Sequence, residues 1–202
     1  MMKRFSSRLT MLAAALAACA GSASAQTTIC NVSVPPGTDD NLEVPANTLC
    51  ELGQFGPGPV IVTGNVTVKS GAVLIVRQFL RLVVNGSVLG TDARTIEMDL
   101  GPGQVSILGS VHLTGTTEEA FLSSVSIRGT LSIANSIGEI NVVSNNVGGS
   151  ALVRANTASG RNFINIEANA IGGSLVCMDN TPAPSGDGNT VGGNKVGQCV
   201  GL

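Results

Sequence analysis

The sequence is poor in aromatic and in charged residues. It contains no Trp and no Tyr, aromatic residues make up 2% of the chain, and Asp, Glu, Lys and Arg together make up 12%. A core built without large rings has to be thin and regular. Nucleic-acid binding calls for clustered Lys and Arg, so the net charge of -2 argues against a nucleic-acid partner. The only histidine, His112, stands between Val111 and Leu113, where strand alternation would turn it outward without an evident nucleophile or carboxylate partner.

Glycine and branched aliphatic residues are abundant instead. Gly occurs 26 times, and 43% of the residues are hydrophobic. Branched aliphatic side chains favour strands over helices. The motif Asn-x-(Ile/Val)-Gly-Gly-(Ser/Asn) occurs at 145–150, 169–174 and 189–194. A relaxed form of it gives anchor glycines 20 to 24 residues apart, at Gly64, Gly86, Gly109, Gly129, Gly149, Gly173 and Gly193. Such a period predicts a solenoid, in which each repeat buries its apolar face by stacking on its neighbours.

Each repeat reads as three short apolar segments, several of which alternate with period two, as in Val66 to Val68. Three strands per turn resemble the right-handed parallel β-helix of the pectate-lyase-like superfamily, and the hexapeptide rhythm of left-handed β-helices is not seen. The resemblance implies an all-β chain of about six to seven coils of 20 to 24 residues. We expect the anchor glycines to supply positive φ at the corners. The recurrent asparagines are expected to stack into a ladder, at Asn145, Asn169 and Asn189.

The first 25 residues have the features of a bacterial secretory signal peptide. Basic residues precede an apolar run over 9–20, and an Ala-x-Ala at 23–25 would release a chain that begins at Gln26. The run is too short to span a membrane, so no transmembrane segment is expected in the mature chain. An alternative is a lipid anchor on Cys19, because Leu-Ala-Ala-Cys at 16–19 resembles a lipoprotein signal. Both alternatives predict a secreted, periplasmic or outer-surface protein.

The remaining cysteines form one pair near each end of the chain, Cys30 with Cys50 and Cys177 with Cys199. Four cysteines allow three pairing schemes, and only this scheme forms a disulfide between cysteines close in sequence at each end of the chain. Free buried thiols are the alternative, and a zinc site is not expected because no CxxC motif or paired histidine accompanies the cysteines.

We therefore expect a signal peptide over 1–25, a disulfide-bonded N-terminal cap over 26–54, β-helix coils over 55–176 and a disulfide-clamped C-terminal cap over 177–202. The four phenylalanines beyond the signal peptide are expected to fill the core or the caps: Phe55, Phe79, Phe121 and Phe163. The C-terminal segment resembles a module of uncharacterised secreted bacterial proteins through Gly172-Gly173-Ser174-Leu175-Val176-Cys177 and Gly193-Asn194-Lys195-Val196-Gly197-Gln198-Cys199.

Pectate lyases and polygalacturonases share this type of fold, so the resemblance raises an enzyme hypothesis. Their chemistry needs carboxylates that converge on one face, either to hold Ca2+ or to act as a pair. The aspartates at Asp92, Asp99, Asp179 and Asp187 are not expected to converge in this way. We therefore expect no catalytic residue, no cofactor and no metal site.

One weak candidate for a binding site is an acidic stripe. Glu97, Glu119 and Glu139 follow their anchor glycines by 11, 10 and 10 residues, so they could project from one edge on successive coils. Such a stripe could bind a divalent cation or a glycan, or simply keep solenoids apart. We predict a non-enzymatic structural, adhesive or surface-interaction protein of the bacterial envelope, with a cell-surface polysaccharide or another envelope protein as partner. The alternatives are a polysaccharide-binding or polysaccharide-cleaving protein and a self-assembling solenoid.

Overall fold

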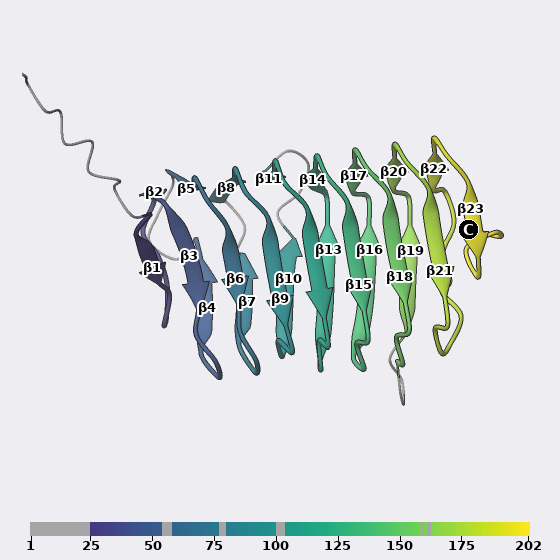
Figure 1. Ribbon diagram of the computed structural model, residues 1–202, viewed down its shortest axis with the longest axis horizontal. Helices are drawn as coiled ribbons and strands as arrows, with labels where there is room; N and C mark the ends of the chain where they lie inside the picture. The colour runs from purple at the N-terminus through teal and green to yellow at the C-terminus, as the bar shows by residue number, and fades with distance from the viewer. Residues whose placement is uncertain (1–24, 54–57, 77–79, 100–103, 159, 161–162) are drawn as a thin grey trace, which may run out of the picture.

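The computed structural model describes residues 25–53, 58–76, 80–99, 104–158, 160 and 163–202, which form a parallel β-solenoid of about seven turns (Figure 1). The described residues contain no helix, and the strands form three all-parallel sheets. The expected all-β solenoid is confirmed. Residues 1–24 of the predicted signal peptide, which include Cys19, lie outside the described residues, as do Phe55 and Phe79.

The coils from β2 to β19 each cross sheet B, then sheet A, then sheet C, whereas the strands at the two ends of the stack belong to sheets A and B only. Sheet A contains β1 (Thr27–Ile29), β3 (Asn41–Val44), β6 (Val66–Val68), β9 (Val88–Thr91), β12 (Val111–Thr114), β15 (Leu131–Ala134), β18 (Ala151–Arg154), β21 (Leu175–Met178) and β23 (Lys195–Gly197). Sheet B contains β2 (Gly37–Asp39), β5 (Gly58–Val62), β8 (Leu80–Val84), β11 (Val105–Ile107), β14 (Val125–Ile127), β17 (Asn146–Val147), β20 (Ala170–Ile171) and β22 (Thr190–Val191). Sheet C contains β4 (Leu49–Leu52), β7 (Val73–Val76), β10 (Thr95–Asp99), β13 (Glu119–Ser123), β16 (Glu139–Val143) and β19 (Ile164–Glu167).

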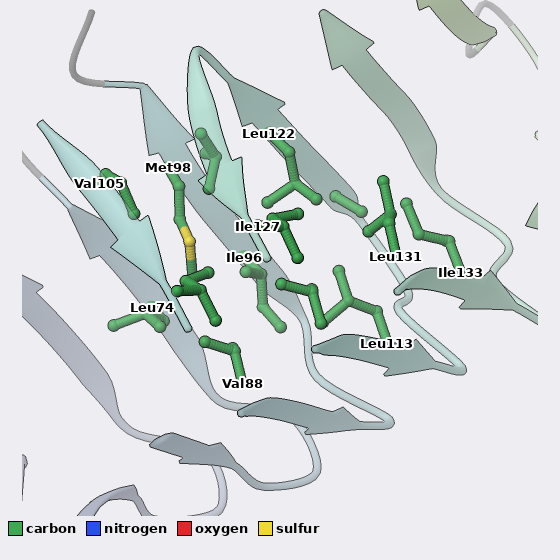
Figure 2. Close-up of a cluster of buried hydrophobic side chains, with 14 of the residues drawn as sticks. Leu74, Val88, Ile96, Met98, Val105, Leu113, Leu122, Ile127, Leu131 and Ile133 are labelled. Carbon is green, nitrogen blue, oxygen red and sulfur yellow. The ribbon is translucent and has the colours of Figure 1, made fainter. Parts of the chain in front are cut away.

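Strand alternation fills the interior with aliphatic side chains. In β12, Val111 and Leu113 are fully buried whereas His112 faces solvent, as the sequence predicts. Figure 2 shows how the three sheets meet: Leu113 comes from sheet A, Ile127 from sheet B and Met98 from sheet C. Because the side chains that meet are aliphatic and of similar size, the interior can be narrow and regular without aromatic rings.

The anchor glycines stack directly on one another at the corner between sheets B and A. The main-chain N–H of Gly149 donates to the main-chain O of Gly129 over 2.9 Å, and Gly173 bonds to Gly149 in the same way over 2.8 Å. The prediction of positive φ at these glycines is wrong, because none of them has it. Glycine is needed here for close approach instead: a Cβ on Gly149 would lie 2.7 Å from the carbonyl O of Gly129.

The predicted asparagine ladder is present at the corner between sheets C and B. Asn145 Nδ2 donates to Asn169 Oδ1 over 3.0 Å, and Asn169 Nδ2 donates to Asn189 Oδ1 over 2.9 Å. A second ladder, which sequence reasoning missed, runs along the corner between sheets A and C. There Asn156 Nδ2 donates to Asn180 Oδ1 over 2.9 Å, and Asn180 Nδ2 donates to Gln198 Oε1 over 3.0 Å. These side chains satisfy buried main-chain groups at the corners, such as the N–H of Asn145 and the carbonyl of Val142.

Disulfides tie both ends of the stack. Cys30 bonds to Cys50 and Cys177 to Cys199, with Cα–Cα distances of 5.5 and 5.2 Å that suit a disulfide, and all four residues are fully buried. The predicted pairing is thus confirmed. The segments 26–54 and 177–202 also contribute strands to the sheets, from β1 to β4 and in β22 and β23.

The terminal strands of sheet A carry polar residues at positions that continue the buried rows. Thr28 lies opposite Leu42, and its Oγ1 donates to Asp39 Oδ1 over 2.7 Å. Lys195 lies opposite Leu175, and its Nζ donates to the main-chain O of Leu202. Inward-facing polar groups blunt a sheet edge against pairing with another chain. Each terminal strand of sheet A therefore carries one such polar side chain.

Candidate binding face on sheet C

The outer face of sheet C concentrates negative charge. Six of the 13 acidic residues of the chain lie in its strands, and these strands contain no Lys, Arg or His. The six are Glu51, Glu97, Asp99, Glu119, Glu139 and Glu167. All six are at least partly exposed, because they occupy the outward positions between buried aliphatic residues. The outer face of sheet C is thus an acidic surface of parallel strands.

The strand register places two of the three predicted stripe residues in one row and the third in the next. Glu119 lies directly opposite Glu139 across neighbouring strands, which are about 4.8 Å apart in a parallel sheet. Glu97 lies opposite Phe121, two positions further along, and Thr95 takes the place opposite Glu119. The three glutamates therefore project from successive coils of the same sheet, but in two neighbouring rows.

Two differences of one residue each explain the shift of Glu97. Glu97 follows its anchor glycine by 11 residues instead of 10, and the corner before β10 is one residue shorter. Three residues separate β9 from β10, whereas four separate β12 from β13 and β15 from β16. The same number of residues counted from the anchor glycine therefore reaches one position further along the strand in the coil that holds Glu97. Because side chains alternate with period two, Glu97 still faces outward, and it contributes to the same acidic face from the adjacent row.

Apolar side chains occupy the middle of this acidic face. The row that runs from Glu51 continues through Ile75, Glu97, Phe121 and Asn141. Phe121 points outward and is only partly buried, so the expectation that it fills the core is wrong. Strand alternation could have revealed this, because the flanking Ala120 and Leu122 are the buried residues of β13.

The second phenylalanine near this face also departs from its expected position. Phe163, immediately before β19, is 42% exposed rather than part of the core or a cap. Its main-chain O accepts a hydrogen bond from the N–H of Ile140 over 3.0 Å, which fixes it beside β16. The outer side of sheet C therefore presents two aromatic rings in a chain that has very few.

The carboxylates of this face repel one another. Burial raises the pKa of Glu119 above its ordinary value of 4.5, and the charges of Glu139 and Glu97 raise it further. Asn141 Nδ2 donates to Glu139 Oε1 over 2.6 Å and so holds that carboxylate in place. The nearest paired cation, Arg94, lies at the preceding corner and contacts Glu118 over 3.6 Å rather than the stripe. A positive charge brought to this face would relieve the repulsion.

The remaining residues considered for metal binding or catalysis are not part of the acidic face. Among the described residues, no group of three or more His, Cys, Asp or Glu side chains is arranged to hold a metal ion. His112 lies on the outer face of sheet A, between Leu89 and Ser132, and thus on a different sheet from the stripe glutamates. In the described ranges, no helix is long and apolar enough to cross a membrane.

Comparison with known proteins gives no relative from which a role could be transferred. No family model matches the chain, and neither the curated proteins nor the solved structures contain a match to it. The fold and the acidic face are therefore the basis for a functional proposal.

Proposed function

We propose that the chain is an exported, non-enzymatic protein of the bacterial cell envelope that binds a positively charged surface of another envelope protein through the outer face of sheet C. The observation that carries the proposal is the concentration of six carboxylates around Phe121 and Ile75 on one flat sheet. Relatedness to the pectate-lyase-like superfamily and to secreted bacterial proteins is part of this proposal and rests on the sequence resemblance.

Charge complementarity argues for a basic partner. Complementary potentials raise the rate of association and exclude partners of like charge. On this face, a Lys or Arg side chain between Glu119 and Glu139 would neutralise charges that repel one another in the free protein. Phe121 would supply the apolar contact that interfaces place at their centre, with charged residues around it.

The rigidity of the scaffold supports a binding role. Hydrogen-bonded ladders run along the corners, and disulfides tie both ends of the stack. A surface that is already ordered loses little conformational entropy when a partner binds. The buried disulfides also fit an oxidising compartment outside the cytoplasm.

Binding to a defined polycation tests the proposal. We would measure the affinity of mature protein for poly-L-lysine of one chain length, by titration calorimetry at low and at physiological salt. The test variant carries Glu97→Gln, Glu119→Gln and Glu139→Gln together. Its matched control removes three exposed acidic charges elsewhere, at Glu118, Asp179 and Asp187.

The two triple variants have the same net charge, so they separate the face from overall charge. We expect the sheet C variant to bind at least about tenfold more weakly than wild type, and the control to bind within about threefold of wild type. Equal weakening of both variants would refute a specific face. Binding of a neutral polysaccharide such as dextran, with loss of that binding in Phe121→Ser and without binding to poly-L-lysine, would favour the polysaccharide alternative instead.

A further inference from the structure

The first coil holds the main-chain nitrogen of Gln26 against a carboxylate. The Gln26 N–H donates to Asp40 Oδ2 over 3.0 Å, and the Gln26 carbonyl accepts a hydrogen bond from the N–H of Asn41 over 3.1 Å. The other oxygen of Asp40, Oδ1, accepts a hydrogen bond from Thr63 Oγ1 over 3.4 Å. Gln26 is thus fixed at both of its main-chain polar groups, directly before β1 begins at Thr27.

The surroundings of this contact are polar. A cavity at the N-terminal end is lined by Gln26, Thr28, Thr38, Asp39 and Asp40. Thr28 Oγ1 donates a hydrogen bond to Asp39 Oδ1, so the carboxylates of Asp39 and Asp40 have different partners. Asp40 is the carboxylate that meets the main chain of Gln26.

The expected signal-peptide cleavage would free the same main-chain nitrogen, that of Gln26. Hydrolysis after the Ala-x-Ala at 23–25 adds one water across the Ala25–Gln26 peptide bond, which leaves a carboxylate on Ala25 and an α-ammonium on Gln26. We propose that Gln26 is the mature N-terminus and that Asp40 binds its α-ammonium as an ion pair. The nitrogen that would become charged already lies at ion-pair distance from Asp40 Oδ2 in the uncleaved chain.

This pair would change the chemistry of the new terminus. A free N-terminal glutamine cyclises when its neutral α-amine attacks its own side-chain amide carbon: the new C–N bond forms, and one ammonia leaves. Asp40 favours the protonated amine, which has no lone pair for that attack. The hydrogen bond from Asn41 to the Gln26 carbonyl also holds the main chain of this residue against the next coil. Gln26 should therefore persist as an open glutamine in the folded protein.

The experiment uses the exported protein and the signal peptidase of a bacterial host. Its first readout is the N-terminal sequence and intact mass of the secreted chain. We expect a chain that begins at Gln26, and a chain that begins at a lipid-modified Cys19 would overturn the proposal. This result is independent of poly-L-lysine binding, so it does not depend on the function proposed for sheet C.

The second readout is the rate at which the mature chain loses one ammonia from its N-terminus, followed by mass spectrometry at neutral pH. Asp40→Asn should accelerate this loss about two- to fivefold, as expected for removal of an exposed ion pair, and high salt should remove the difference. Asp39→Asn is the matched control, because Asp39 contacts Thr28 instead, and it should leave the rate unchanged. Equal rates in wild type and Asp40→Asn, with both proteins folded by circular dichroism, would overturn the proposal.

Discussion

The ladder formed by Asn145, Asn169 and Asn189 permits a sharp test of what holds the corners together. Asn169 is 1% exposed, and its side chain makes four hydrogen bonds. Nδ2 donates to the carbonyl of Val142 over 2.8 Å and to Asn189 Oδ1 over 2.9 Å. Oδ1 accepts from the main-chain N–H of Asn145 over 2.9 Å and from its Nδ2 over 3.0 Å. The change Asn169→Ala removes all four bonds at once.

The decrease in the free energy of unfolding follows from the polar groups that lose a hydrogen-bond partner in Asn169→Ala. A buried polar group left unsatisfied costs about 1–3 kcal/mol, so the loss of several such bonds at Asn169 should destabilise the fold by about 3–5 kcal/mol. For a domain of this size that corresponds to a fall in melting temperature of about 10 °C. The assay is thermal and chemical unfolding followed by far-ultraviolet circular dichroism, because the chain has no Trp for fluorescence. The control is Asn146→Ala, at an exposed position one residue beyond Asn145, which should change stability by less than about 0.5 kcal/mol.

A second variant tests the direction of the hydrogen bonds. In Asn169→Asp, an oxygen replaces Nδ2 and faces two acceptors, the carbonyl of Val142 and Asn189 Oδ1. Only the protonated carboxyl can donate to one of them, so folding favours that form. The variant should consequently be less destabilised at acidic pH than at neutral pH. An Asn169→Ala protein within about 1 kcal/mol of the Asn146→Ala control would refute the claim that the ladder satisfies the corner.

Three further predictions concern other parts of the scaffold. Gly149→Val should lower the melting temperature by about 5 °C or more, because the Cβ of the valine would meet the backbone of the preceding coil. The control Gly37→Val should not lower it, because no atom lies within 4 Å of a Cβ at that position. Equal melting temperatures for the two variants would contradict the close approach at Gly149. Glu119 has a raised pKa in the folded protein, so its contribution to stability is present below its ordinary pKa of 4.5 and is lost as pH rises through the folded value. Glu119→Gln should therefore stabilise the protein by about 0.5 kcal/mol at pH 7 and not at acidic pH, as pH-dependent melting would show, and a variant less stable at pH 7 would refute the repulsion. Replacing Cys177 and Cys199 together by serine should cost about 3 kcal/mol in chemical unfolding, and unchanged stability would mean that the bond does not constrain the chain.

The sequence alone predicted the parts of the structure that repeat. The period of the anchor glycines predicted the coils, and the recurrent asparagines predicted the ladder at Asn169 because stacked coils bring equivalent positions together. Local pairing of the cysteines was likewise predictable, because each pair lies near one end of the chain.

The sequence did not predict the row of Glu97, the outward position of Phe121 or the second ladder, and each has its own reason. Glu97 lies in a different row from Glu119 because it follows its anchor glycine by one residue more and the corner before β10 is one residue shorter, and the spacing from the anchor glycines does not reveal which corner is shorter. Phe121 was misplaced for a different reason, because a scarce aromatic residue was assumed to be buried although alternation turns it outward. The second ladder was missed because Asn156 and Asn180 lie outside the repeated motif.

The way the second ladder ends at Gln198 has a consequence for the length of the molecule. Gln198 takes the place of a further asparagine in this ladder. Its Oε1 accepts hydrogen bonds from the N–H and Nδ2 of Asn180, and its Nε2 donates to the Asn180 carbonyl over 2.8 Å. Asn156 and Asn180 bond to each other at a spacing of 24 residues. Duplication of one 24-residue unit, such as 155–178, would therefore add one asparagine to this ladder with the same spacing. The ladder itself therefore does not limit the number of coils, so proteins of this design can change length by whole coils while Gln198 and the Cys177–Cys199 disulfide stay at the C-terminal end.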